Sequence, residues 1–344
     1  MTFLERFVSN PLGDNTDLSK LHVQNPEWTL FSLAYTVYAV TNMSMMDTTF
    51  RNQAINITDQ AIQKIKSERV FSTYFGDKNP LSPEIDSIGS VLYFGHLNLV
   101  LSCYRLLTQD DRYNALHDSL SLFLYRRFTQ SKFLNLESYP QNIWIPDNIV
   151  ALASLHLHSK ITGSEYGTVT NDWVLYAKSN LLDKESGLLV SKINSYTGKM
   201  EEGTRGSMLG WSILFMNRFD SLFARQQYEI FKSKFTTNVG IFRLCQERYK
   251  TYTSDIYGDI DSGPILFGYS IPSITFCFGN ALAFKDLVNA KRLKRVINLG
   301  LKEVNEKDEL YYKTKFVNLN YSPLAEAMLL YLETYTEWRI LGNR

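Results

Sequence analysis

The feature of this sequence that most limits its fold is a series of six helices that are apolar on all sides. Their expected first residues lie at nearly constant intervals of 59, 61, 58, 57 and 61 residues, at positions 27, 86, 147, 205, 262 and 323. A more amphipathic helix follows most of them, such as 112–128. A helix that is apolar all round has to be surrounded by protein, whereas an amphipathic helix covers it from one side. A repeat of this length without close identity indicates repeated helical hairpins.

The expected helix starts carry local signals. A capping residue stands within two residues of a proline at four of these starts, residues 25–26, 146–147, 262–264 and 322–323. At residues 86–87 the capping residues occur without a proline. The last helix is expected to run towards Trp338. No linker rich in Pro, Gly or Ser divides the chain. We therefore predict an all-α fold, an (α/α)6 barrel or toroid of six helical hairpins, with short β-like loops at its mouth and one domain over residues 1–344.

Charge and composition exclude several classes of protein. The 36 basic and 35 acidic residues nearly balance, and no basic run is interleaved with aromatic residues, so the positive field of a nucleic-acid binder is missing. Three widely spaced cysteines predict no disulfide framework. The five histidines lack metal-ligand spacing, and His156 and His158 would face different sides of a helix. We expect no nucleic-acid partner, no metal and no cofactor.

Targeting and membrane signals are weak throughout the sequence. Residues 1–10 include apolar side chains but no apolar core long enough for a signal peptide. No later window reaches the roughly 18 uncharged apolar residues of a membrane span. We expect a soluble protein, cytoplasmic by default, and leave open an exported or membrane-associated form if the native start lies further upstream. The oligomeric state has no recognisable signal.

Three short motifs and the spacing of the hairpins resemble known families. Asp183-x-x-Ser186-Gly187-Leu188 resembles a turn that leaves an outer helix in unsaturated-glucuronyl hydrolases and their relatives. The run Arg205-Gly206-(x)3-Gly210-Trp211 is similar to the Arg-Gly-x-Gly-Trp that starts an inner helix there, with two extra residues. Trp144-x-x-Asp147-Asn148 resembles the aromatic-Asp-Asn starts of other inner helices. The whole pattern resembles the six-hairpin glycosidase superfamily.

A second resemblance is to barrels of the linalool dehydratase/isomerase type, which are similar in overall pattern. The cysteines that line the pocket in that family have no obvious counterparts here, because Cys103 and Cys277 fall inside expected helices. This departure weighs against a direct transfer of terpene-alcohol chemistry.

The resemblance implies that the inner-helix N-termini converge on one mouth, whose loops build the site. The stretch 201–211 joins two carboxylates, a guanidinium and three glycines to an apolar helix. Helix N-termini favour such sites, although the charges could also pair for structure alone. The predicted substrate-binding residues are the charged and aromatic side chains of these loops: Trp28, Tyr93, Tyr139, Trp144, Asn148, Glu201, Glu202, Arg205, Trp211 and Tyr249.

Three carboxylates are the predicted catalytic groups: Asp147, Asp259 and Asp261. Asp259 and Asp261 would face the same side of an extended, glycine-bounded loop. Two carboxylates held together raise the pKa of one of them, which produces a general acid at neutral pH. The alternative is that Asp147 and Asp261 only cap helices.

These residues leave three functions open. The first is acid/base chemistry on a sugar-like or cyclic substrate, as in a glycoside hydrolase or lyase, with aromatic side chains stacking on the ring. The second is a hydro-lyase or isomerase of the linalool type, acting on an apolar terpene-type alcohol. The third is a barrel that binds a ligand without catalysis. The expected partner is a small molecule, either a carbohydrate or a terpenoid.

Overall fold

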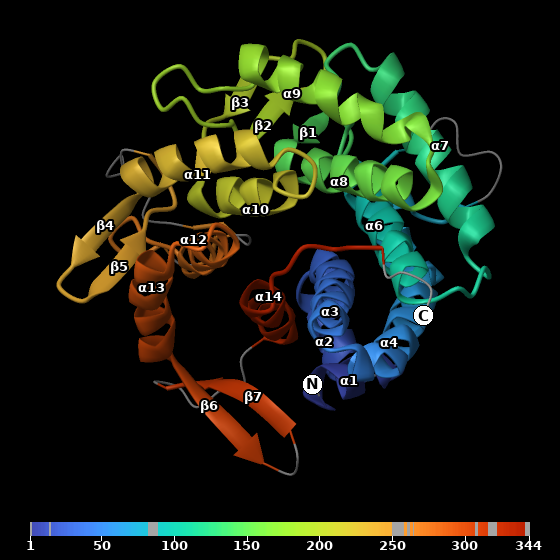
Figure 1. Ribbon diagram of the computed structural model, residues 1–344, viewed down its shortest axis with the longest axis horizontal. Coiled ribbons are helices and arrows are strands. Elements are labelled where there is room, and N and C mark those ends of the chain that lie inside the picture. The colour runs from blue at the N-terminus through green and yellow to red at the C-terminus, as the bar shows by residue number, and fades with distance from the viewer. Residues whose placement is uncertain are drawn as a thin grey trace.

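A ring of six inner helices forms the centre of the molecule. The computed structural model describes residues 2–13, 15–81, 89–249, 258–259, 262–263, 265–306, 309–315 and 322–340. Each inner helix packs against the next, and the last returns to the first, which closes the ring (Figure 1). The predicted (α/α)6 barrel is therefore confirmed. The inner helices are α3 (Pro26–Met46), α6 (Val91–Leu107), α8 (Ile145–Thr162), α10 (Gly206–Met216), α12 (Ile271–Ala283) and α14 (Pro323–Glu333).

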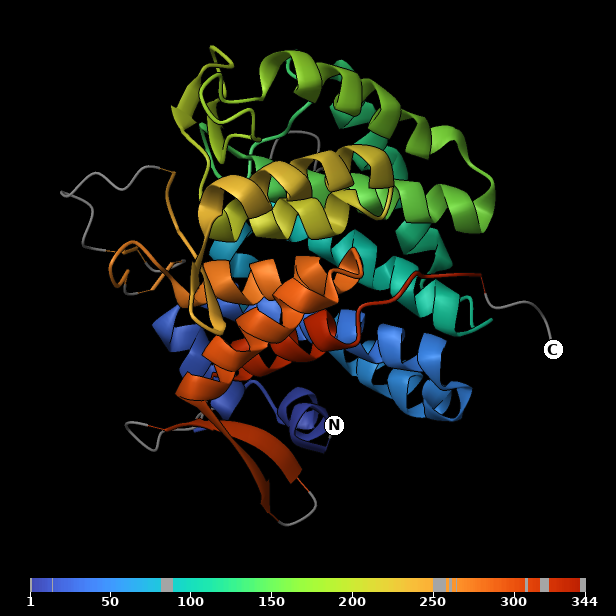
Figure 2. The same ribbon diagram turned by 60° about the vertical axis from the view of Figure 1, so that its left-hand side comes forward.

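The inner helices are apolar on all sides because protein surrounds them. In α10 every residue is buried, and in α6 only Arg105 is not. Outer helices cover the ring, and each packs on the inner helix that precedes it in the chain. These outer helices are α4 (Arg51–Ile65), α7 (Asn114–Gln130), α9 (Val169–Asn180), α11 (Ser221–Phe235) and α13 (Leu287–Gly300). Figure 2 shows α11 lying outside α10 and α13 outside α12.

The remaining helical segments fill the first part of the chain and one later turn. The N-terminal helix α1 contacts α4, α14 and β7, so it covers α14 from outside. These segments are α1 (Thr2–Ser9), α2 (Asp17–Gln24), α5 (Glu68–Phe75) and the short 3-10 helices η1 (Thr48–Phe50) and η3 (Glu165–Thr168). Across the described residues, every helix is too short or too polar to cross a bilayer.

Short strands occur in the loops, as predicted. The loops that lead into α8 and α10 form an antiparallel sheet of β1 (Asn142–Trp144), β2 (Lys192–Asn194) and β3 (Met200–Glu202), in that order. Ile143 lies opposite Ile193 in its register. Two hairpins follow outer helices, β4 (Thr236–Val239) with β5 (Phe242–Cys245) and β6 (Leu301–Glu306) with β7 (Glu309–Thr314).

Two predicted helix starts were wrong by several residues. Helix α6 begins at Val91 instead of near residue 86, and α12 begins at Ile271 instead of near residue 262. In each case a later serine is the cap: Ser90 accepts from the Tyr93 backbone N–H, and Ser270 accepts from that of Ser273. Tertiary contacts select these caps, because the Ser90 hydroxyl also donates to the Ser138 carbonyl and the Ser270 hydroxyl to Glu247. Asp86 lies outside the described residues.

The last helix also ends earlier than predicted, at Glu333. The segment 334–340 leaves the helix and passes the C-terminal end of α3, where the Trp338 indole donates to Asn42 Oδ1 at 2.7 Å. The Arg218 guanidinium lies 3.9 Å from the centre of the Trp338 ring. A side-chain bond and a cation–π contact favour the extended path over a longer helix.

Candidate functional site

A cavity of about 280 Å³ lies where the N-terminal ends of α3, α10, α12 and α14 meet. The convergence of inner-helix N-termini is as predicted. Trp28 and Ser262, both expected on this rim, line the cavity directly. Most of its wall is apolar, and five aromatic side chains contribute to it: Trp28, Phe31, Tyr35, Trp211 and Phe276. Met208, Ile271, Pro272, Leu324, Ala325 and Met328 complete the apolar wall, and the polar side chains are Ser207, Ser262, Thr275 and Ser322.

Helical spacing and one glycine place the aromatic wall. Trp28, Phe31 and Tyr35 follow each other at i, i+3 and i+7, so they lie on one face of α3. Trp211 of α10 stacks on Phe276 of α12, with ring centres 6.2 Å apart. Helices α10 and α12 approach closely at Gly210, where a Cβ would lie 2.7 Å from the Phe276 Cβ. The stacking of Trp211 on Phe276 thus depends on the absence of a side chain at Gly210.

Three buried polar atoms belong to two residues of this wall, Tyr35 and Trp211, and to the neighbouring His96. Among the described residues, Tyr35 Oη, His96 Nε2 and Trp211 Nε1 have no hydrogen-bond partner. The three rings are neighbours, because His96 lies 6.4 Å from Tyr35 and 5.9 Å from Trp211 between ring centres. The other nitrogen of His96 contacts the Tyr38 hydroxyl at 2.9 Å. An unsatisfied buried polar group costs about 1–3 kcal/mol, so these atoms suit a polar group of a ligand.

Burial keeps the ionisable members of this group uncharged. Burial lowers the pKa of His96 to about 3, so the imidazole is neutral at pH 7. Burial also raises the pKa of Tyr35 well above its usual value, with smaller contributions from Tyr331 and Asp147. The cavity wall therefore offers neutral hydrogen-bonding groups.

A second group of polar side chains combines carboxylates with phenols. The Tyr139 hydroxyl donates to Glu27 Oε1. Burial raises the pKa of Glu27, although the Tyr139 hydrogen bond acts in the opposite direction. Burial raises the pKa of Tyr74 and Tyr139, and the charges of Glu27 and Asp147 raise them further. Asp147 itself is only 4% exposed. These residues form one acidic group, in which Glu27, Tyr74 and Tyr139 are half-buried and the predicted catalytic Asp147 is buried.

Glu27 lies in the first turn of α3, next to residues of that helix that line the cavity. Glu27 precedes Phe31 by four residues and Tyr35 by eight, so the three side chains lie along one side of the helix. Phe31 and Tyr35 line the cavity. The sequence places Glu27 in a mouth loop, but we predicted no role for it. The same helical spacing, read from Phe31 and Tyr35, would have identified it.

Arg205 makes its contacts with protein carboxylates. Its Nε donates to Glu247 Oε1 at 3.0 Å, and its two terminal nitrogens donate to the Asp259 carboxylate at 2.7 and 2.9 Å. Glu202 lies further away, at 3.7 Å. Burial alone would lower the pKa of Arg205, but Glu247 and Asp259 outweigh it and raise the pKa. With 1% of its side chain exposed, this guanidinium is turned away from solvent.

Glu247 holds the starts of α10 and α12 together. Its carboxylate is fully buried and accepts from Arg205, from the Ser207 hydroxyl at 2.6 Å and from the Ser270 hydroxyl at 2.6 Å. The backbone at Gly206 also packs tightly against that of Gln246, because a Cβ at Gly206 would lie 2.1 Å from the Gln246 carbonyl oxygen. No local pattern in the sequence predicts a role for Glu247, since its partners lie 23 to 42 residues away in the chain.

The contacts of Asp259 favour a structural role over an acid/base role. Besides Arg205, its Oδ1 accepts from the Ser262 backbone N–H at 2.8 Å. Burial would raise the pKa of Asp259, but Arg205 and the Ser262 hydrogen bonds lower it. A general acid needs the opposite shift. Asp261 lies outside the described residues, so the predicted Asp259–Asp261 pair is described only for its first member.

The other predicted substrate-binding residues contact protein groups outside the cavity wall. The side-chain amide of Asn148 accepts a hydrogen bond from the Leu136 backbone N–H and donates one to the Leu136 carbonyl. The Tyr93 hydroxyl donates to the Ile65 carbonyl at 2.9 Å. Lys192 lies over the Trp144 ring, and Tyr249 stacks on Phe235. Glu201 pairs with Lys192 at 3.1 Å.

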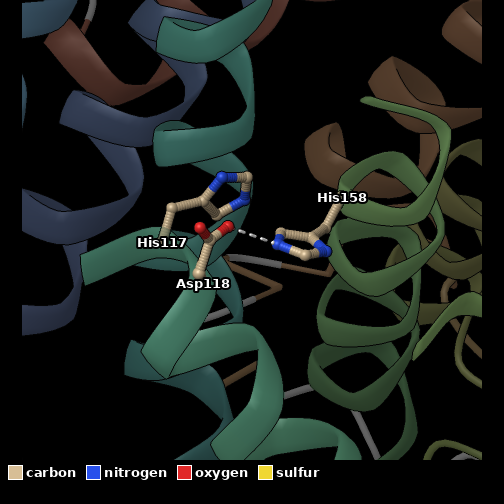
Figure 3. A group of neighbouring side chains, drawn as sticks. All are labelled: His117, Asp118 and His158. Carbon is tan, nitrogen blue, oxygen red and sulfur yellow. Dashed lines mark hydrogen bonds and ion pairs between the residues drawn. The ribbon is translucent and has the colours of Figure 1, made fainter. Parts of the chain in front are cut away.

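Metal-ligating side chains gather at the other end of the barrel. His117 and Asp118 of α7 lie beside His158 of α8 (Figure 3). The histidine spacing in the sequence predicts no such group, because 40 residues separate the members that meet.

Comparison with known proteins gives a family and a fold. A sequence profile described as linalool dehydratase/isomerase matches residues 114–315. Among solved structures, a family 105 glycoside hydrolase from C. acetobutylicum has a TM-score of 0.59 at 12% identity, over 92% of this chain and 97% of that one.

Two further structures are similar. A family 76 mannosidase from Bacteroides thetaiotaomicron has a TM-score of 0.57 at 10% identity, over 90% of this chain and 86% of that one. An unsaturated glucuronyl hydrolase specific for heparin has a TM-score of 0.56 at 11% identity, over 89% and 85%. Identities this low show the six-hairpin fold alone.

Proposed function

Because the chain belongs to the linalool dehydratase/isomerase family, we propose that it is an acid/base enzyme that dehydrates or isomerises an apolar, terpene-type alcohol. The observation that carries this proposal is the cavity at the barrel mouth, which is apolar over most of its wall. Glu27 and Asp147 lie in the first turns of α3 and α8, at the same mouth. An unsaturated hydrocarbon chain gains free energy by leaving water for such a wall, at roughly 25 cal/mol per Å².

The same wall disfavours a sugar. Every hydroxyl of a polyhydroxylated ring needs a hydrogen-bond partner when it leaves water. The described lining of the cavity offers Ser207, Ser262, Thr275, Ser322 and Tyr35 as polar side chains, and these lie among apolar and aromatic groups. The substrate that fits has one hydroxyl and a large apolar remainder.

Tyr35, His96 and Trp211 are the groups that we assign to that hydroxyl. Each has a buried polar atom without a partner among the described residues. The neutral imidazole of His96 can accept a hydrogen bond at Nε2 if its Nδ1 carries the proton and donates to Tyr38. Trp211 can only donate, so the trio can both donate to and accept from an alcohol.

The chemistry that we assign needs one acid and one base. Glu27, whose pKa is raised by burial, gives its proton to the substrate hydroxyl, the C–O bond breaks and water leaves. Asp147 takes a proton from the carbon next to the resulting cation, and the electron pair of the broken C–H bond forms the new double bond. The faces of Trp28, Phe31 and Trp211 would stabilise the transient positive charge. When water adds to the other end of an allylic cation and gives up a proton to the Glu27 carboxylate, the product is an isomerised alcohol.

The test is to incubate the purified protein with linalool, other unsaturated alcohols and a panel of oligosaccharides, and to analyse products by gas chromatography and mass spectrometry. We expect a dehydrated or rearranged product from an unsaturated alcohol, with oxygen-18 from labelled water in the isomerised alcohol. Hydrolysis of an oligosaccharide instead would overturn the proposal in favour of glycosidase chemistry. Tight binding of the alcohols without any turnover would identify a ligand-binding barrel.

A further inference from the structure

The cluster of His117, Asp118 and His158 combines three side chains that commonly bind metals. One nitrogen from each histidine and one carboxylate oxygen all lie within 4.8 Å of one another (Figure 3). His117 and Asp118 belong to the beginning of α7, and His158 to the last turns of α8. Two imidazole nitrogens with a carboxylate oxygen form a donor set used by Zn²⁺ and other first-row divalent metals.

The surroundings orient both imidazoles. His158 Nε2 lies 2.8 Å from Asp118 Oδ1, while its Nδ1 lies 2.9 Å from the Ser164 hydroxyl. A metal-bound histidine characteristically hydrogen-bonds through its other nitrogen in this way. His117 Nε2 lies 2.8 Å from the Ser102 hydroxyl, and its Nδ1 is a buried atom without a partner among the described residues.

An ion could reach this cluster from solvent. The Asp118 side chain is 51% exposed, whereas the His158 side chain is 2% exposed. The competing cation is Arg105, whose Nη1 lies 2.6 Å from Asp118 Oδ1. His158 contacts the same oxygen, Oδ1, so the other carboxylate oxygen of Asp118 can bind an ion.

We propose that His117, Asp118 and His158 bind one divalent transition-metal ion, such as Zn²⁺, that fastens the start of α7 to the end of α8. Metal–ligand bonds of about 2.0–2.2 Å put tetrahedral ligands about 3.4 Å apart, so the group must contract by about 1.4 Å at its widest separation. Rotation of the half-exposed Asp118 side chain can supply much of this movement. His158 changes tautomer, so that Nδ1–H donates to Ser164 and Nε2 faces the ion.

Such an ion would be structural, because the cluster lies at the opposite end of the inner helices from the cavity. Asp147 lies in the first turn of α8 at the mouth, and His158 follows eleven residues later, about 16 Å along the axis at 1.5 Å per residue. The proposed metal site therefore does not depend on the function proposed for the cavity.

The test uses untagged, chelator-treated protein titrated with ZnCl2 by calorimetry at pH 7.5, with Co²⁺ absorption as a second readout. We expect one ion per chain, and a melting temperature that rises on addition of Zn²⁺. Asp118→Asn keeps the shape of the side chain but removes its charge, and should weaken Zn²⁺ binding at least tenfold and abolish the thermal shift. His156→Gln is the matched control, because His156 lies two residues from His158 on the same helix but outside the cluster.

A third variant separates a metal site from an ion pair. Arg105→Gln removes the competing guanidinium, so it should tighten Zn²⁺ binding about threefold or more. Equal Zn²⁺ affinity of the wild type and Asp118→Asn, or no binding at 1 mM Zn²⁺, would overturn the proposal. So would an Asp118→Asn protein that loses thermal stability while the wild type gains none from the ion, because the cluster would then be a hydrogen-bonded ion pair alone.

Discussion

Two groups of charged residues at the barrel mouth differ in how their surroundings shift the pKa of a carboxyl group. Around Arg205, each polar contact is made within the protein: Glu247 accepts from three side chains and Asp259 from both terminal nitrogens. Around Glu27 and Asp147, the pKa of Glu27 is raised, and the Tyr74 hydroxyl has no partner within the described residues. The paired charges around Arg205 lower the pKa of Asp259 and stabilise the fold, whereas a carboxyl whose pKa is raised by burial is suited to acid chemistry.

The largest effect that would test this comparison is on turnover. Glu27→Gln keeps the size of the side chain but cannot give up a proton as an acid. Loss of a general acid typically costs about 100- to 10,000-fold in rate, so we expect kcat to fall by that factor with little change in melting temperature. The measurement is the rate of alcohol consumption beside the unfolding curve. Glu201→Gln, which changes a surface partner of Lys192, is the control and should be neutral.

Asp147→Asn examines the other member of the acidic group. We expect a comparable loss of turnover, because the base that removes the proton from carbon is gone. If Asp147→Asn retained full activity while Glu27→Gln did not, the base would be assigned to another residue, with the neutral imidazole of His96 as the first candidate.

The paired group should respond in stability instead. Glu247→Ala leaves the buried Arg205 without its closest buried partner, and breaking a buried pair typically costs about 3–5 kcal/mol. Urea unfolding followed by circular dichroism measures this loss. Arg205→Lys, which keeps the charge but loses the planar fork, should lower stability and activity together. Loss of activity alone in Arg205→Lys would place this guanidinium on the substrate.

Tyr35→Phe tests the hydroxyl-binding role of the cavity wall. The substitution removes one hydroxyl that has no protein partner within the described chain, so it should leave the free protein as stable or slightly more stable. Loss of one hydrogen bond to substrate is worth about 0.5–1.5 kcal/mol, which is roughly a two- to tenfold rise in KM or Kd. An unchanged KM together with reduced kcat would indicate a role in proton transfer.

The smallest expected effect concerns Asp259 and pH. Because Arg205 holds the pKa of Asp259 below its usual value, this carboxylate stabilises the fold above pH 4, and that contribution is lost as the pH falls through its lowered pKa. Glu27 has the opposite effect on the pH dependence of stability. Because its pKa is raised, the folded state loses stability as the pH rises past the ordinary pKa of glutamate. Asp259→Asn should therefore flatten the acid side of a plot of stability against pH.

The same variant decides between the two readings of the 258–263 loop. Asp259 is partly exposed, so its pair with Arg205 is worth at most about 1 kcal/mol, and activity should be retained. A loss of activity by 100-fold or more at unchanged melting temperature would return the acid/base role to this loop.

The architecture could be predicted from the sequence to the extent that its signals were local. Apolar periodicity identified the inner helices, and proline with a capping residue placed three of their starts, at Pro26, Ile145 and Pro323, within about two residues. Two starts were wrong where an earlier and a later serine offered equal caps. A local pattern cannot choose between them, since contacts with Ser138 and Glu247 decide the outcome.

By itself the sequence determined which kinds of side chain surround the mouth, because each inner helix brings the residues just before and after its first turn. Only the tertiary structure decided their partners. Arg205 could pair with Glu201, Glu202, Glu247 or Asp259 as far as charge is concerned, and the approach of α10 to α12 selects the last two. Likewise, Glu27 meets Tyr139, and His117 meets His158, only because the ring closes. Helical periodicity is encoded over a few residues, whereas pairing depends on distances between helices that lie far apart in the chain.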